Sequence, residues 1–441
     1  MSNPIIKGGV SRRTILKTAG AAGAALAATG LSTPAVFGQT RKQIRFLNAE
    51  TSMDSIRALK VAAAEYERQT GVEVVIDSVP LGDVFTKVTT SLRSGNPYDI
   101  ATVAFAGHVL LLANEGHLVD MTPLTSKHEW GKNILFPMDG KTYWYPYDYN
   151  LAWIYYRKDL YEQNGLEVPK DQATFLANAQ ALTKDNMSGS ILPIASNGAT
   201  NWLSPGFLWA EGVEVFDDQW NIIIDNADNA PKTKAYLDFF GDLYKTMPSG
   251  TSQASYSEML TSFTSGSVAH SAYAGRLVET IERNSPDLAD KFGIFPYMDS
   301  SGTGKAVNHG YDGWVVLNTD AAEESMKFME WFTENQLINF LHTAPLHFQP
   351  ARLDIYDDPR WKAHPLIEKH AGLVESMKGF LTDPGMTITS IDTQGPAPDL
   401  RPGKVFESFA LSEMLQQKCL LGTSSDAALE MGAQKMRDAI A

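Results

Sequence analysis

Hydrophobic residues beyond Thr40 recur with two different periods, and these periods alternate along the chain. Residues 44–47 form a short apolar run typical of a strand, and apolar positions between 56 and 66 recur at helical spacing. Gly71 ends this predicted helix, and residues 72–79 predict a second strand. A strand, a helix and a second strand in this order form the unit from which parallel sheets are built. The pattern therefore predicts an α/β fold.

Later segments repeat this alternation. We predict helices at about 82–93, 172–182, 232–245 and 325–341, and strands at 99–103, 192–195, 292–296 and 313–317. No fixed repeat period is present, which excludes a solenoid. Roughly 400 residues follow the N-terminal segment, too many for a single hydrophobic core, so we expect two domains.

The first 38 residues have the composition of a signal peptide. Four basic residues precede an uncharged run, 19–31, that is rich in Ala and Gly and too short to span a bilayer. Residues 11–17, Ser-Arg-Arg-Thr-Ile-Leu-Lys, resemble a twin-arginine export signal. We predict twin-arginine export, in preference to the ordinary secretory route, with cleavage after Gly38 or Ala35 and release into the periplasm.

Charge and cysteine content narrow the choice of partners. The chain has a net charge of −14, and removal of the four basic charges of residues 1–38, which include no acidic residue, leaves −18. Such a surface repels nucleic acid and anionic membranes, so neither is an expected partner. Cys419 is the only cysteine, so no intramolecular disulfide forms, and no Cys lies near the predicted cleavage site to carry a lipid anchor. We expect a free monomer.

A series of short blocks resembles, in order, those of extracellular solute-binding protein family 1, which includes maltose-binding protein. The blocks lie at 94–100, 115–124, 139–160, 263–269, 310–316, 349–352 and 421–429. The most distinctive is 139–160, where Asp-Gly-Lys-Thr-Tyr is followed by Tyr-Pro-Tyr and Ile-Tyr-Tyr-Arg-Lys-Asp-Leu. Each block alone is a weak signal, but their order along nearly the whole predicted mature chain is a strong one.

The resemblance implies a two-lobed periplasmic-binding-protein fold with a hinge and a ligand cleft between the lobes. We expect lobe one at 40–149 plus 298–344, and lobe two at 150–297 plus 345–441. The family's role implies a small sugar, oligosaccharide or polyol ligand, captured by hinge closure, and an ABC permease in the inner membrane as partner. We expect no cofactor.

Polar and aromatic side chains gather where ligand-binding residues of such folds are expected, beyond the carboxyl ends of strands. Aromatic rings cover the apolar faces of a sugar, and carboxylates, amides and Arg pair with its hydroxyls, because an unpaired buried polar group costs about 1–3 kcal/mol. The candidates are Glu50, Phe105, His108, Tyr147, Asp148, Asn150, Trp202, Tyr273, Arg276, Tyr311, Asp312 and Trp314. Arg276 has two open interpretations: a salt bridge with Asp312, or a contact to an anionic or highly hydroxylated ligand.

Other classes of protein fit less well. The sequence has no Gly-rich dinucleotide loop, no Cys cluster, no His-x-x-x-His pair and no Gly-x-Ser-x-Gly elbow, so we expect no enzyme. The spacing of the Asp residues between 217 and 228 misses the calcium-loop pattern, so no metal site is expected. An exported glycosidase needs only two carboxylates and stays an alternative. Binding of a polyamine, a peptide or an anionic or phosphorylated polyol is a further alternative.

Overall fold

The first predicted strand-helix-strand unit is present at the N-terminal end of the computed structural model, which describes residues 42–184 and 186–441. β1 (Gln43–Asn48) pairs in parallel with β2 (Glu73–Ser78), and α2 (Met53–Thr70) connects them. The Ser52 side chain accepts a hydrogen bond from the Ser55 N–H at the start of α2. Gly71 ends the helix with a φ of 76°, a conformation that favours glycine. The predicted signal peptide, residues 1–38, lies outside the described residues.

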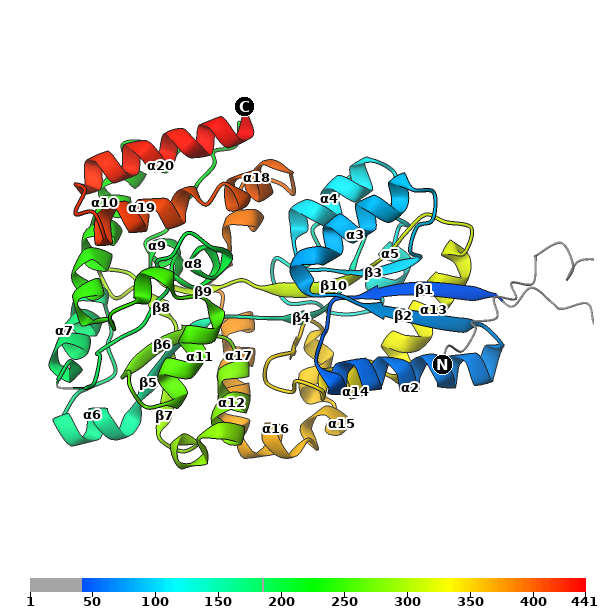
Figure 1. Cartoon of the computed structure of the whole chain (residues 1–441), viewed down its shortest axis with the longest axis horizontal. Coiled ribbons are helices and arrows are strands. Elements are labelled where there is room, and N and C mark those ends of the chain that lie inside the picture. The colour runs from blue at the N-terminus through cyan, green and yellow to red at the C-terminus, as the bar shows by residue number, and fades with distance from the viewer. Residues whose placement is uncertain (1–41, 185) are drawn as a thin grey trace, which may run out of the picture. The chain divides into compact units, whose positions relative to one another are not determined.

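The largest sheet has six strands in the order β11-β4-β10-β3-β1-β2. Its other strands are β3 (Ile100–Val103), β4 (Tyr145–Tyr149), β10 (Tyr311–Val316) and β11 (Gln349–Pro350). β1 and β3 are parallel, whereas β10 runs antiparallel to both β3 and β4. The late strand β10 therefore lies between two strands from the first third of the chain. α3 and α4 lie above this sheet in Figure 1, and α2 and α14 lie below it.

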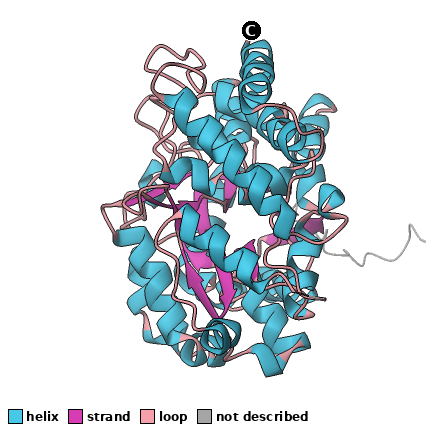
Figure 2. Ribbon diagram, turned by 90° about the vertical axis from the view of Figure 1, so that its left-hand side faces the viewer, coloured by secondary structure: helices cyan, strands magenta, loops and turns pink. Residues whose placement is uncertain are grey.

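Two three-stranded sheets form the other part of the fold. One has the order β6-β5-β7 and the other β12-β9-β8. Their strands are β5 (Trp153–Arg157), β6 (His270–Tyr273), β7 (Phe292–Phe295), β8 (Tyr297–Met298), β9 (Lys305–Asn308) and β12 (Met386–Thr389). The turned view in Figure 2 shows the strands surrounded by helices. The lobe boundaries predicted from the sequence stay a prediction.

Helices cover all three sheets. In the first half of the chain, the helices after α2 are α3 (Leu81–Arg93), α4 (Ala106–Asn114), α5 (Thr122–Thr125), α6 (Lys158–Asn164), α7 (Gln172–Leu182), α8 (Gly198–Leu203) and α9 (Gly206–Ala210). Those that follow are α10 (Asn229–Leu243), α11 (Tyr256–Thr264), α12 (Arg276–Asn284), α13 (Ala322–Asn335), α14 (Leu337–Leu341), α15 (Pro359–Lys362), α16 (Pro365–Lys369), α17 (Ala371–Thr382), α18 (Arg401–Glu407), α19 (Ala410–Cys419) and α20 (Ser425–Ile440). Short 3-10 turns are η1 (Tyr244–Thr246), η2 (Thr251–Gln253), η3 (Pro286–Leu288), η4 (Leu353–Asp357) and η5 (Ile391–Thr393). Within these described ranges, no helix has the length and apolar character needed to cross a membrane.

Two predicted elements differ from the structure. Residues 192–195 form no strand, and only Ile191 makes an isolated bridge, with Ser271. Pro193 lacks the N–H that a ladder requires, which accounts for the missing strand. The helix predicted at 325–341 is two helices, α13 and α14, which meet at Gln336, whose φ and ψ are −124° and −11°.

Large aromatic side chains are buried around the six-stranded sheet. Tyr147 of β4 lies with its ring centroid 4.4 Å from that of Trp314 and 5.2 Å from that of Phe340. Tyr145 and Trp314 are also fully buried, with their ring centroids 6.3 Å apart. Trp209 of α9 is buried as well.

Candidate functional site

A cavity of about 580 Å³ opens beyond the ends of β1, β3 and β10. Its lining includes residues that follow these strands, such as Glu50 and Phe105, and residues from α8, α11 and α12, such as Trp202, Tyr256 and Arg276. A volume of this size suits a small organic ligand. The wall is therefore built from segments far apart in the sequence.

Aromatic rings form part of the cavity wall. Trp202 and Tyr273 meet edge to face, with ring centroids 5.8 Å apart and planes at 75°. Tyr256 also lies beside Trp202, at a centroid distance of 6.0 Å. Phe105 and Phe406 form a second pair, at 5.6 Å. Flat apolar rings of this kind pack against the CH faces of sugar rings and against aliphatic ligands.

The polar part of the wall centres on the end of β4. The Asn150 N–H donates to the Gly310 carbonyl at 2.7 Å, and Asn150 Nδ2 donates to Asp312 Oδ2 at 2.8 Å. A Cβ on Gly310 would lie 2.8 Å from Trp202 Nε1, so this close approach requires glycine. Asn150 Oδ1 and Trp202 Nε1 are buried without a hydrogen-bond partner. Both residues line the cavity.

Three carboxyl groups lie close together beside Asn150. Asp148 Oδ1 accepts the Asp312 N–H at 2.9 Å, and the Tyr147 hydroxyl lies 3.5 Å from Glu50 Oε1. Burial, followed by the nearby Glu50 charge, raises the pKa of Asp312 to about 7. Burial also raises the pKa of Glu50, and it raises that of Asp148 well above its usual range, with a further contribution from Asp312. When all three groups are ionised, their negative charges repel one another.

Arg276 and His309 complete the polar set. Arg276 is the first residue of α12, where the positive end of the helix dipole repels a cation. Of the two interpretations of Arg276, the salt bridge with Asp312 is not formed: the side-chain hydrogen bond to Asp312 comes from Asn150, and Arg276 acts on this carboxyl only through its charge. Both ring nitrogens of His309 are buried without a partner, and burial lowers the pKa of this imidazole to about 3. No group of three His, Cys, Asp or Glu side chains in the described ranges is placed to hold a metal ion.

Residues 61–369 match the family described as bacterial extracellular solute-binding protein. The chain belongs to this family. One relative of this solute-binding protein is the ABC transporter periplasmic-binding protein YcjN of Escherichia coli (strain K12). YcjN is 21% identical over 416 residues, which cover 91% of this chain and 94% of YcjN. The family predicted from the sequence blocks is confirmed.

Solved structures of other solute-binding proteins share the fold. A Thermotoga lettingae protein bound to alpha-D-tagatose is 18% identical, with a TM-score of 0.69 over 91% of this chain and 100% of that chain. An Agrobacterium vitis protein with bound D-mannitol is 19% identical, with a TM-score of 0.66 over 90% of this chain and 98% of that chain. The predicted two-lobed α/β fold is confirmed.

Eight of the predicted site residues line the cavity of this solute-binding protein. They are Glu50, Phe105, Asn150, Trp202, Tyr273, Arg276, Tyr311 and Asp312. Tyr311 also braces the wall, because its hydroxyl accepts the Ala106 N–H at 3.1 Å and donates to Asp392 Oδ2. Whether each of these residues contacts ligand stays a prediction.

Four predicted residues lie outside the lining. Tyr147 and Trp314 pack against each other in the core, and Asp148 is fully buried behind Asp312. β4 is buried on both faces between β10 and β11, so strict alternation along the strand does not bring Tyr147 to the surface. His108, on α4, borders a smaller neighbouring cavity and stacks on Phe85 with ring centroids 3.8 Å apart.

Sequence reasoning missed several lining residues, among them Tyr256, His309, His347, Asp392 and Phe406. His309 precedes the 310–316 block directly, which is a signal that sequence inspection could have used. Asp392 follows β12, a strand that the sequence analysis did not predict, and Phe406 lies on α18.

A close contact between α4 and α18 borders the smaller neighbouring cavity. A Cβ on Gly107 would lie 3.3 Å from the Gly403 Cα, so the two helix backbones nearly touch. Beside them, His108 Nε2 lies 3.3 Å from Glu407 Oε1. Side chains larger than hydrogen at the two glycines would separate the helices.

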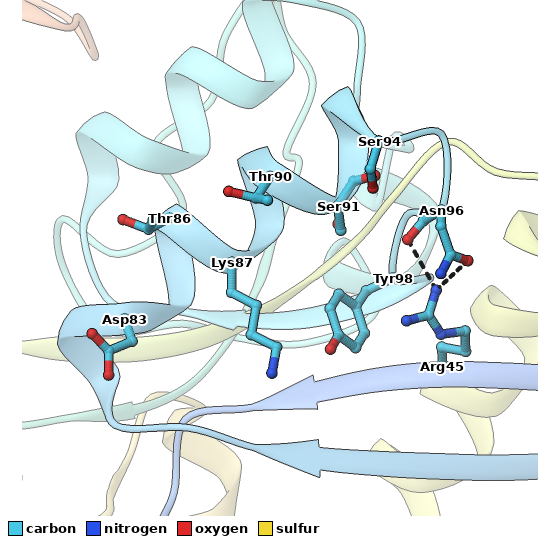
Figure 3. A pocket seen from close by; sticks show the side chains of 9 residues that line it. All are labelled: Arg45, Asp83, Thr86, Lys87, Thr90, Ser91, Ser94, Asn96 and Tyr98. Carbon is cyan, nitrogen blue, oxygen red and sulfur yellow. Dashed lines mark hydrogen bonds between the residues drawn. The ribbon is translucent and has the colours of Figure 1, made fainter.

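A second groove, of about 440 Å³, lies along α3 (Figure 3). Its arginine, Arg45, is already engaged: Nη1 donates to Asn96 Oδ1 at 2.7 Å, and the guanidinium lies 4.6 Å from the centre of the Tyr98 ring. None of the described side chains that line this groove has a buried polar atom without a partner. The larger cavity is therefore the candidate site.

Proposed function

We propose that this protein captures a sugar, oligosaccharide or polyol in the periplasm and delivers it unchanged to the permease of an ABC importer. The observation that carries the proposal is the pairing, in one cavity, of aromatic faces with buried polar atoms that have no protein partner. Each hydroxyl of a sugar both donates and accepts hydrogen bonds, so the hydroxyls together can satisfy the Trp202 indole N–H, the side-chain Oδ1 of Asn150 and the His309 ring nitrogens. The ligands named for the tagatose- and mannitol-bound structures support the same class.

Hinge closure is the mechanism that we propose. Residues 40–149 plus 298–344 would form one lobe, and residues 150–297 plus 345–441 the other; Glu50 and Asp312 then belong to the first lobe and Trp202 and Arg276 to the second. A ligand that contacts both sets prefers the closed form. Moving the equilibrium from mostly open to mostly closed needs about 5.5 kcal/mol, less than the roughly 8 kcal/mol of a micromolar site.

We also propose that the protein acts as a monomer, without a cofactor, after twin-arginine export and removal of residues 1–38. A net charge of −18 for the remaining chain suits a soluble periplasmic carrier. Its partner is the inner-membrane permease, which would recognise the closed form.

A thermal-shift screen of residues 39–441 against sugars, polyols, sugar acids, polyamines and peptides tests the function. A ligand at about a hundred times its Kd adds roughly 2.7 kcal/mol to the free energy of unfolding, which raises Tm by a few degrees. Trp202→Ala should abolish the shift, because it removes an aromatic face of the cavity. Trp331→Ala is the matched control, since Trp331 is partly exposed on α13 and donates to Gln69 instead. A response to peptides or linear polyamines alone would overturn the proposed ligand class.

A further inference from the structure

Acidic side chains outnumber cationic ones at the candidate site. Glu50, Asp312 and Asp392 line the cavity, and Asp148 lies directly behind Asp312. Arg276 is the one Lys or Arg side chain among the described residues of the lining. The lining histidines, His309 and His347, add no positive charge near neutral pH, because burial lowers the pKa of both imidazoles.

Two of these carboxylates have acceptor oxygens left for a ligand. Asp392 is satisfied by the protein, because Ser390 Oγ donates to its Oδ1 at 2.5 Å and the Tyr311 hydroxyl donates to its Oδ2. Asp312, by contrast, accepts a side-chain hydrogen bond only at Oδ2, from Asn150, within the described residues. The only hydrogen bond to the Glu50 carboxylate among the described residues is the 3.5 Å one with the Tyr147 hydroxyl.

Arg276 does not neutralise this pair directly. No carboxylate oxygen of the described residues lies within ion-pair distance of its guanidinium. Its field also acts on Glu279, one turn later in α12, whose Oε1 accepts the N–H groups of Leu346 and His347 at 3.2 Å. The single positive charge is therefore shared among several carboxyl groups, and a cationic ligand group would relieve the repulsion among them.

The cavity lining also contains buried polar atoms without a protein partner, an observation that is independent of the carboxylates. His309 is 1% exposed and Asn150 is 8% exposed, yet both ring nitrogens of His309 and the Asn150 Oδ1 have no hydrogen-bond partner. Both residues line the same cavity as Glu50 and Asp312. The ring faces of Trp202 and Tyr273 nearby are favourable surroundings for a cation.

We propose that the ligand is a sugar or polyol that carries a protonated amino group, held by Glu50 and Asp312, while Asn150, His309 and Arg276 bind its hydroxyls. This inference rests on the proposed function and specifies its substrate class. The like-charge effect of Glu50 on the pKa of Asp312 agrees with it, because a cation between the two carboxylates would relieve that repulsion.

The test compares matched ligands that differ in one substituent. Calorimetry on the mature chain near neutral pH would use glucosamine, glucose and glucuronate, then galactosamine, galactose and galacturonate, and then 1-amino-1-deoxysorbitol, sorbitol and gluconate. In a series that binds, the amine should bind at least about tenfold more tightly than the neutral member, and the carboxylate most weakly, since one charge-assisted hydrogen bond corresponds to roughly that factor.

Two isosteric variants assign the effect to residues. Glu50→Gln and Asp312→Asn should each weaken binding of the amine at least about tenfold and change binding of the neutral member by less than about threefold. Asp218→Asn, at an exposed position away from the cavity, removes the same charge and should leave both affinities unchanged. Thermal unfolding curves of the variants check that each is folded.

The outcomes separate the inference from the proposed function. A neutral or carboxylate member that binds as tightly as the amine overturns the inference and leaves the sugar-binding function in place. Equal weakening of amine and neutral members by Glu50→Gln and Asp312→Asn also overturns the inference. Failure of every member of all three series, together with no response to any sugar or polyol in the thermal screen, overturns both.

Discussion

Asp312→Asn removes a buried carboxyl whose ionisation opposes folding at high pH. The folded-state pKa is raised from its ordinary 3.8 to about 7, mainly by burial and then by Glu50. Stability from the protonated form is therefore complete below about pH 4 and is lost as the pH rises through about 7. The loss is on the order of 4 kcal/mol once the pH exceeds both values. Asn keeps an oxygen for the hydrogen bond from Asn150 and carries no charge, so the variant avoids this loss.

Urea unfolding without ligand, followed by tryptophan fluorescence, measures the difference. At about pH 8.5 the variant should be more stable than the wild type, and at about pH 5 most of that advantage should disappear. Glu50 and Asp148 remain in the variant, and their raised pKa values keep part of the pH dependence in both proteins. Asp218→Asn should follow the wild type at both pH values. A gap between variant and wild type that is the same at both pH values would refute the reasoning.

Three further changes test other features. Gly403→Val adds a side chain where α18 meets α4, two helices that belong to different lobes under the proposed boundaries. It should weaken binding of any ligand found by the screen at least about threefold, by calorimetry, with unchanged circular dichroism. Unchanged affinity would argue against a role for this contact in hinge closure. Gly275→Ala would place a Cβ 1.6 Å from the Leu346 carbonyl oxygen and should lower the free energy of unfolding in urea by about 3 kcal/mol or more. Gly372→Ala, with open space around it, should not lower it. Equal stability of the two variants would argue against the clash. Burial raises the pKa of the Cys419 thiol to about 12, so the native protein should react slowly with Ellman's reagent and rapidly after unfolding; fast native reaction would show an accessible thiolate.

Local patterns predicted most of the fold, and they failed where tertiary structure decides. The helix α2 was predictable because Ser52 and Gly71 mark its ends and apolar residues recur between them. The break between α13 and α14 at Gln336 has no Gly or Pro to announce it. β11 is only two residues long and exists because Gln349 pairs with Tyr149, a contact 200 residues away.

The candidate site was predictable where a polar or aromatic residue follows a strand. Glu50 after β1, Asn150 after β4 and Phe105 after β3 all line the cavity, as the carboxyl-end rule for open α/β sheets indicates. Tyr147 shows the limit of that reasoning, because a strand buried on both faces offers no outward side. Asp392 shows the other limit, since it follows β12, a four-residue strand that was not predicted from the sequence.

The position of β10 in the six-stranded sheet determines when that sheet can be completed during synthesis. β3 and β4 are joined only through β10, which begins at residue 311. A nascent chain that has emerged as far as residue 310 therefore carries β3 with one exposed edge, a template for pairing with other chains. No fragment that ends before residue 311 can contain the finished sheet, so the region around β1 cannot be produced as a separate, contiguous N-terminal piece. The polypeptide must remain protected from aggregation until more than two thirds of it has been made.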